Sequence, residues 1–160
     1  MIGHRYLRLV SRNYKIHDQE DLHYLTYATV GWVDVFTRPT YKDILVESLR
    51  YCQEAKGLEL FVWCIMSNHV HLIARARPDT KLQDILRDHK KFTAKAVVKA
   101  NEENPQESCR EWLLACLRTS EGGVQLWQHG LHPIWLRRTD IIKQKLRYIH
   151  HNPVEEGLVE

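Results

Sequence analysis

The sequence predicts an α+β fold, because segments with strand-like composition alternate with segments of helical spacing along a single chain of 160 residues. Hydrophobic residues make up 44% of the chain, enough to bury one substantial core, and the length favours one domain. No apolar run approaches the roughly 18 residues of a membrane span, and no apolar stretch typical of a signal peptide follows Met1. We therefore expect a cytoplasmic protein without a membrane partner.

The first half of the chain predicts a strand, a helix and a hairpin. Residues 23–30 are rich in β-branched and aromatic types and end at a glycine, which is typical of a strand that runs into a loop. Apolar positions recur at helical spacing over 40–57, which predicts a helix. Two apolar runs, 58–66 and 69–76, flank a Ser-Asn pair suited to a tight turn, so we expect them to pair as a hairpin.

The segment that follows the hairpin predicts one long helix and several short elements. Asp79-Thr80 can cap a helix whose apolar spacing continues to about Asn101. Residues 107–117 are expected to form a short extra helix. Two further runs, 124–128 and 133–138, have the composition of short strands.

The last predicted element is a helix that has Asp140 as its N-cap and whose end is marked by Pro153 and Gly157. The order of elements predicts a β-α-β-β-α-β core, in which an antiparallel sheet carries helices on one face. This arrangement is ferredoxin-like, with the C-terminal helix added to it. We assign residues 1–21 to a basic N-terminal arm and 22–160 to the single domain.

Two segments combine reactive side chains at spacings that place them together. His69 and His71 alternate on the second strand of the hairpin, so both imidazoles point to one face and can hold one metal ion. Tyr148 and Asn152 are four residues apart in the last helix and share a face of it. A phenol is mostly protonated at neutral pH, so its attack on phosphorus needs a nearby base or cation. The pattern predicts a metal-assisted tyrosine nucleophile that acts on DNA.

The formal net charge of +3 permits nucleic acid binding without requiring it, but the basic residues are clustered. They gather in the N-terminal arm, in residues 75–99 and around the last helix. The second cluster follows the His pair directly, so we expect a basic helix beside the proposed metal. One such cluster is most often a solvated helix face, but the convergence of three clusters on one site favours contact with a phosphate backbone. The residues that we expect to contact DNA are Arg75, Arg77, Arg87, Lys90, Lys91, Lys95, Trp127 and Arg147.

Exposed aromatic side chains are expected to stack on unpaired bases. The candidates are Tyr27, Trp32, Trp127 and Trp135, although Trp127 can equally anchor the fold. Trp63 and Trp112 lie in apolar patterns, so we expect both in the core.

Three motifs resemble those of the single-tyrosine HUH transposases, particularly the REP-associated tyrosine transposases. They are Met-Ser-Asn-His-Val-His-Leu-Ile at 66–73, Leu-Trp-Gln-His-Gly at 126–130 and Tyr-Ile-His-His-Asn-Pro-Val-Glu-Glu-Gly-Leu-Val at 148–159. The likeness covers about residues 22–159 in the expected order. An isolated H-x-H is weak evidence in a chain with ten histidines, and the specificity comes from the joint match.

The resemblance implies a mobile-element or domesticated transposase that cuts and rejoins single-stranded DNA beside hairpins, either REP-like or at insertion-sequence ends. His69 and His71 would bind a divalent metal, Mg²⁺ or Mn²⁺. Tyr148 would attack the scissile phosphate and leave a 5′-phosphotyrosine link and a free 3′-hydroxyl. Asn152 takes the place of a glutamine that completes the metal shell in insertion-sequence relatives and is one methylene shorter, so it is a provisional third ligand. The resemblance is compatible with a monomer or a homodimer.

Two other functions remain open at this point. A non-catalytic module of the same fold would bind single-stranded RNA or DNA without chemistry. A metal-dependent hydrolase would use water in place of the tyrosine as nucleophile. His150 and His151 are adjacent to Tyr148, but consecutive helix residues point about 100° apart, so we expect at most one of them to assist.

Overall fold

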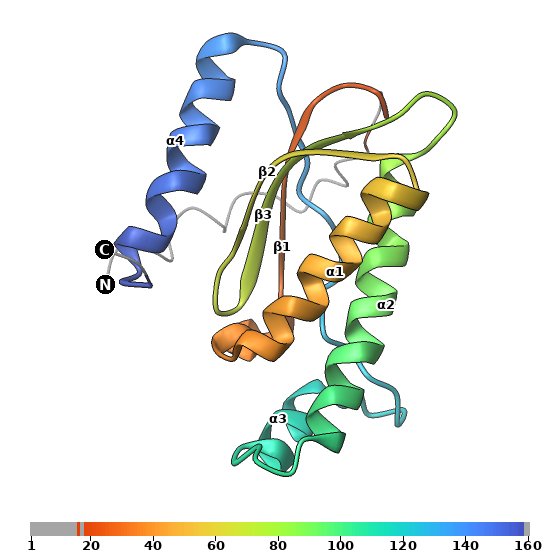
Figure 1. Ribbon diagram of the computed structural model, residues 1–160, viewed down its shortest axis with the longest axis vertical. Helices are drawn as coiled ribbons and strands as arrows, with labels where there is room; N and C mark the ends of the chain where they lie inside the picture. The colour runs from red at the N-terminus through yellow and green to blue at the C-terminus, as the bar shows by residue number, and fades with distance from the viewer. Residues whose placement is uncertain (1–15, 17, 159–160) are drawn as a thin grey trace.

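The computed structural model describes Ile16 and residues 18–158, so most of the predicted arm lies outside the described residues. The described chain contains a four-stranded antiparallel sheet with the strand order β2-β3-β1-β4 (Figure 1). The strands are β1 (His23–Ala28), β2 (Leu58–Ile65), β3 (His69–Ala76) and β4 (Ile134–Trp135), and the helices are α1 (Pro39–Ala55), α2 (Leu82–Glu103), α3 (Arg110–Leu117) and α4 (Thr139–Glu155). The predicted α+β class and the ferredoxin-like order are confirmed.

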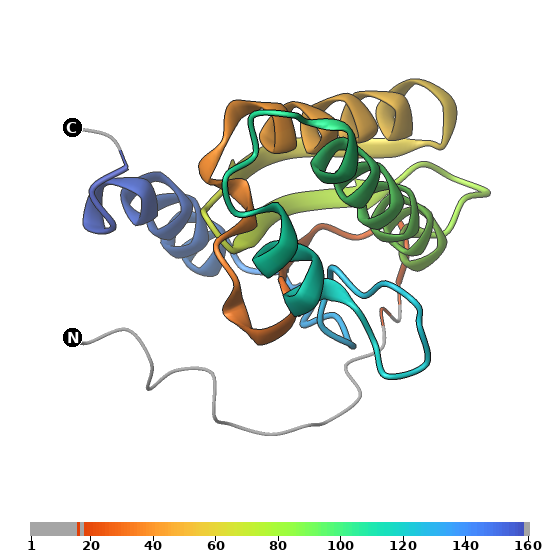
Figure 2. The same ribbon diagram turned by 90° about the horizontal axis from the view of Figure 1, so that it is seen from below.

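Each face of the sheet is covered by different helices. Helices α1 and α2 lie together on one face, and α4 lies on the other (Figures 1 and 2). The side chains of β3 explain this division, because successive residues point to opposite faces. Val70 and Leu72 are buried in the main core with residues of α1 and α2, whereas Ile73 packs with Tyr24 and Ile149 in a second, smaller cluster. His69 and His71 share the face of Ile73, so they point toward α4.

The residues just before β1 pack against the domain. Ile16 is buried in the main core, and the carbonyl of Gln19 accepts a hydrogen bond from the Ala76 amide. The boundary at residue 22 stays a prediction. None of the helices in the described part of the chain is both long and apolar enough to cross a membrane.

One predicted strand and two predicted helix caps are wrong. The segment 124–128 does not form a strand and is joined to the sheet only by an isolated bridge between Trp127 and Thr29, because Trp127 is drawn into the core instead of alternating along a ladder. The N-cap position of α2 is Lys81, since the Thr80 hydroxyl donates to the Arg77 carbonyl in the preceding turn. At α4, the N-cap is Arg138, two residues before the expected Asp140, which lies in the first turn of the helix.

Of the two residues predicted to mark the end of the last helix, Gly157 lies just beyond that end, with φ +68°, whereas Pro153 does not end the helix. Pro153 lies inside α4, which continues to Glu155. A proline interrupts only the hydrogen bond to the carbonyl four residues before it. The final turn therefore persists, and this keeps Asn152 within regular helix.

His89 is a buried polar side chain between α1 and β1. Its Nδ1 lies 2.8 Å from the Ser48 hydroxyl, and its Nε2 lies 2.9 Å from the Tyr27 hydroxyl. Burial lowers the pKa of His89 to about 4, with a smaller contribution from the Lys90 ammonium. The folded protein therefore holds this imidazole neutral at pH values where an exposed histidine takes up a proton.

The free energy of unfolding should consequently fall as the pH drops from about 6.5 toward 4, because unfolded His89 binds a proton that folded His89 does not. The contribution of His89 to this decrease in the free energy of unfolding approaches about 1.4 kcal/mol per pH unit. Urea unfolding at pH 6.5 and pH 5 should show a smaller pH dependence for His89→Gln than for wild type, since the other histidines contribute equally to both. Identical pH dependence in the two proteins would contradict this assignment.

Candidate active site

Strand β3 and helix α4 bring together the three residues predicted to bind metal. The imidazole rings of His69 and His71 have centroids 4.7 Å apart on the same face of β3. Asn152 approaches both from α4, with its Nδ2 2.8 Å from His71 Nε2 and 3.5 Å from His69 Nε2. Asn152 and Ile149 are the buried residues of α4, so this contact is one of those that hold the helix to the sheet.

His71 is oriented by neighbours on β1 that the sequence did not indicate. Its Nδ1 lies 2.8 Å from the Tyr24 hydroxyl and 3.0 Å from the Thr26 hydroxyl. Donation from Nδ1–H to one of these oxygens leaves the Nε2 lone pair to face Asn152, the tautomer that a metal ligand needs. Thr26 is the register partner of His71 in the antiparallel ladder. Knowledge of that register would have identified Thr26 and Tyr24, but single-strand periodicity does not supply it.

The turn before β3 orients His69 in the same way. The Nδ1 of His69 lies 2.7 Å from Asn68 Oδ1. The Asn68 amide donates to Asp34 Oδ1 over 2.9 Å, and the Ser67 hydroxyl donates to the same oxygen over 2.7 Å. Asp34 thus holds the Ser67-Asn68 turn in place, and Asn68 sets the orientation of the His69 ring.

Both imidazoles are electrically neutral at physiological pH. Burial lowers the pKa of His69, and burial, assisted by His69 and Lys145, lowers the pKa of His71 to about 3. Metal binding requires deprotonated ligands, so neither nitrogen has to release a proton first. Among the described residues no group of three or more His, Cys, Asp or Glu side chains is placed to hold a metal ion. A metal here would therefore rely on two imidazoles and the Asn152 amide, which would have to present its oxygen instead of its nitrogen.

Tyr148 lies one helical turn before Asn152 and faces the same site. Its ring centroid is 5.4 Å from that of His71 and 6.4 Å from that of Tyr24. The side chain is 45% exposed, so a substrate can approach it. Partial burial, and then the carboxylates of Glu155 and Glu156, raise the pKa of Tyr148 and keep the phenol protonated.

Lys145 is a cation that lies over this cluster of aromatic rings. Its Nζ is 4.6 Å from the ring centroid of Tyr24 and 5.7 Å from that of Tyr148. Burial lowers the pKa of Lys145. An ammonium at this position can attract a phosphate and offset the charge of a phenolate. His150 and His151 are both exposed, with ring centroids 5.9 Å from each other.

The family model for IS200-like transposases matches residues 27–114, which is more than half of the chain. The chain belongs to this family. The match includes β3 with the His pair and ends before α4, so it does not cover Tyr148 or Asn152. A search of curated proteins finds no match to this transposase.

Two solved structures have the fold of this transposase. One is a REP-associated tyrosine transposase bound to a REP hairpin, with a TM-score of 0.68, 18% identity, and coverage of 94% of this chain and 76% of that one. The other is a protein from Deinococcus radiodurans described provisionally as a transposase, with a TM-score of 0.54, 21% identity, and coverage of 88% of this chain and 96% of that one. At these identities the likeness shows the shared fold.

The expectation that the basic helix lies beside the His pair is wrong. Helix α2, with Arg87, Lys90, Lys91 and Lys95, packs on the opposite face of the sheet from His69 and His71. The physical reason is that the apolar residues of α2 must cover the apolar face of β3, which is the face without the histidines.

The four basic residues of α2 are not equivalent. Arg87 forms ion pairs with Asp84 and Asp88, and the ammonium of Lys90 donates to the carbonyls of Gln128 and Gly130. Lys91 and Lys95 are exposed. Lys90 thus tethers a loop in this transposase, whereas Lys91 and Lys95 remain candidates for contact with phosphate on the far face.

The other predicted basic contacts lie outside α2. Arg75 shares the His71 face of β3, where it forms an ion pair with Glu59 and lies 5.6 Å from the ring centroid of Phe61. Arg77, after β3, and Arg147, on α4, are exposed. Their contact with DNA stays a prediction.

Several aromatic assignments are corrected by burial. Trp127 is only 5% exposed, stacks on Phe36 and donates its indole N–H to Thr93, so it anchors the fold and is not available to a base. Tyr27 is buried beside it. In contrast, Trp63 and Trp112, expected in the core, are exposed. Trp63 lies on β2, an edge strand, and Trp112 lies outside the buried face of α3, which Leu113, Leu114 and Leu117 form. Trp32 and Trp135 are exposed as expected.

Proposed function

We propose that this transposase cleaves and rejoins single-stranded DNA beside a hairpin through a 5′-phosphotyrosine intermediate. The observation that carries the proposal is the contact of Asn152 with His71, which places Tyr148, one turn away on α4, against the His pair. Membership of the IS200-like transposase family supports the reaction class. The solved structure of a REP-associated relative bound to a REP hairpin, together with the motifs, supports hairpin-bearing DNA as the substrate.

Tyr148 and Lys145 have separate roles in the first step, the attack on the scissile phosphate. The Tyr148 oxygen loses its proton to solvent, which reaches its half-exposed side chain, and forms a bond to phosphorus. The bond from phosphorus to the 3′ oxygen breaks, and that oxygen takes up a proton to become a free 3′-hydroxyl. Lys145 offsets the negative charge near the phenol during this step. Attack by another 3′-hydroxyl on the phosphotyrosine reverses the reaction and restores the tyrosine.

The donor set of the site is suited to a divalent ion, Mg²⁺ or Mn²⁺, held by His69, His71 and the oxygen of Asn152. When bound, such an ion would polarise the scissile phosphate and disperse charge at phosphorus. Two imidazoles with one oxygen suit manganese better than magnesium, which prefers oxygen ligands. Tyr24 and Thr26 hold the tautomer of His71 that leaves its Nε2 free.

A labelled, hairpin-bearing single-stranded DNA tests the proposal directly. The protein is incubated with the DNA and Mn²⁺, and the products are separated on a denaturing gel. We expect a covalent protein–DNA adduct together with a released fragment that ends in a 3′-hydroxyl. A duplex DNA of the same sequence serves as the control and should give no adduct.

The same gel separates the two rival functions. Cleavage without an adduct would favour a hydrolase with water as nucleophile. Binding in a native gel with no cleavage at all would favour a non-catalytic binding module. Either result would overturn the proposal.

A further inference from the structure

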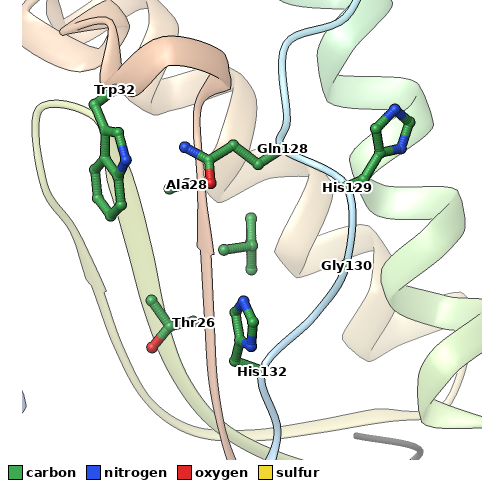
Figure 3. A pocket seen from close by; sticks show the side chains of 8 residues that line it. Thr26, Ala28, Trp32, Gln128, His129, Gly130 and His132 are labelled. Atoms are coloured by element: carbon green, nitrogen blue, oxygen red, sulfur yellow. The ribbon is translucent and has the colours of Figure 1, made fainter. Parts of the chain in front are cut away.

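A small cavity opens at the edge of β1, next to the His pair. Its volume is about 180 Å³, which corresponds to the liquid volume of roughly six water molecules. Strand β4 pairs only with His23 and Tyr24, so the rest of this edge of β1 faces the loop 128–132 instead of a strand. Figure 3 shows Trp32, Gln128 and His132 around this space beside Thr26, while His129 points away from it.

Two walls of the cavity touch the candidate active site. The Thr26 hydroxyl lies 3.0 Å from Nδ1 of His71, and the Trp32 ring centroid is 5.9 Å from that of His69. Thr26 also shares the sheet face of His71, because the two residues are register partners. A group bound in the cavity would therefore lie within one nucleotide of a phosphate at the His pair.

The polar side chains that line the cavity come from Thr26, Tyr27, Gln128 and two histidines, His129 and His132. One N–H of the Gln128 amide donates to the Thr29 carbonyl over 2.9 Å, which fixes the amide and leaves its oxygen and second N–H for a ligand. No carboxylate, lysine or arginine is among the described residues that line the space. Such a lining suits an uncharged heterocycle with both donors and acceptors better than it suits a phosphate or a metal ion.

Trp32 supplies a flat apolar surface at the mouth of this cavity. Its side chain is 39% exposed, and its backbone has φ +57°, a left-handed conformation that bulky residues rarely adopt. Such strain persists only where the surrounding structure holds it, and it recurs at ligand-binding sites. Aromatic faces bind unstacked bases regardless of sequence, whereas a glutamine amide distinguishes them.

We propose that this pocket binds one extruded base of the DNA strand and thereby sets where the strand is cut. Trp32 stacks on the base. The oxygen and the second N–H of the Gln128 amide pair with an adjacent donor and acceptor on the exposed edge of that base, so the pocket favours the base whose edge fits this fixed amide. The inference rests on the proposed function, because it assumes a single-stranded DNA substrate.

The test selects DNA by binding, without cleavage. Tyr148→Phe protein is incubated with a hairpin DNA whose single-stranded flank is randomised, and the bound molecules are recovered and sequenced. We expect enrichment of one base by tenfold or more at one flank position. Adding Gln128→Ala should abolish the enrichment at that position alone, and adding Trp32→Ala should weaken binding of all sequences by tenfold or more. Gln83→Ala, at an exposed glutamine of α2, is the matched control and should retain the preference.

The outcomes distinguish the pocket from the reaction. If Gln128→Ala leaves every preference unchanged, the base pocket is wrong, even where the wild-type protein forms a covalent adduct. If the selection shows a base preference that depends on Gln128 while no adduct forms with wild type, the pocket stands and the proposed reaction fails. Retained binding by Gln128→Ala in the same selection shows that this variant is folded.

Discussion

Replacement of Tyr148 by phenylalanine should abolish the covalent protein–DNA adduct while leaving the protein folded and able to bind DNA. The substitution removes only the oxygen that would attack phosphorus, so strand cleavage should fall by more than about a thousandfold. The side chain is half-exposed and its ring contacts are kept, and the melting temperature should therefore change by less than about 2 °C. Denaturing gels measure the adduct, and native gels measure binding.

Tyr51→Phe provides a matched control for this prediction. Tyr51 is 57% exposed on α1, which lies on the opposite face of the sheet from the site. Its loss should leave adduct formation unchanged. An undiminished adduct from Tyr148→Phe would rule out Tyr148 as the nucleophile and direct attention to another tyrosine.

Removal of the imidazoles should give the second large effect, and the two histidines should differ. His69→Ala and His71→Ala should each reduce cleavage and Mn²⁺ affinity by about a hundredfold or more, because each removes one donor of a small ligand set. His71→Ala should also lower the free energy of unfolding by about 2 kcal/mol, since it leaves the buried Tyr24 hydroxyl and Asn152 amide without a partner. His69 is less buried and bonds to an exposed turn, so its loss should cost less stability.

Calorimetric titration with Mn²⁺ and urea unfolding without added metal measure these two effects separately. His151→Ala is the control, because that histidine is exposed on the same helix as Asn152. Full Mn²⁺ affinity in both His69→Ala and His71→Ala would show that the metal binds elsewhere. Equal loss of stability in the two variants would contradict the structural role assigned to His71.

Local spacing predicted correctly which of these side chains lie close together. The alternation of a strand places His69 beside His71, and one helical turn places Tyr148 near Asn152, whatever the rest of the fold does. The order of strands and helices could also be predicted from the sequence, because apolar residues recur with a different period in a strand and in an amphipathic helix. The hydrogen bonds that orient His71 could not be predicted from the sequence, because they depend on the register between β1 and β3.

Errors arose where sequence proximity was taken for spatial proximity. Helix α2 follows the His-bearing strand directly, yet its apolar stripe has to cover Leu72 and its neighbours, which point away from the histidines. Trp127 has an apolar partner on every side only after α2 and β1 have met, so no local pattern revealed its burial. Trp63 is the opposite case: it was expected to be buried and is exposed, because the position of β2 at the edge of the sheet cannot be predicted from local sequence.

The thin attachment of α4 has a consequence for motion. A segment held by few buried contacts opens with a free energy well below that of global unfolding. Of the 17 residues of α4 only Ile149 and Asn152 are buried, and Asn152 is itself a proposed ligand. Anything that binds at the His pair through Asn152 would therefore also slow hydrogen exchange along α4. Ligand binding at the His pair and the mobility of α4, which carries Tyr148, would then both depend on the local opening equilibrium of that helix.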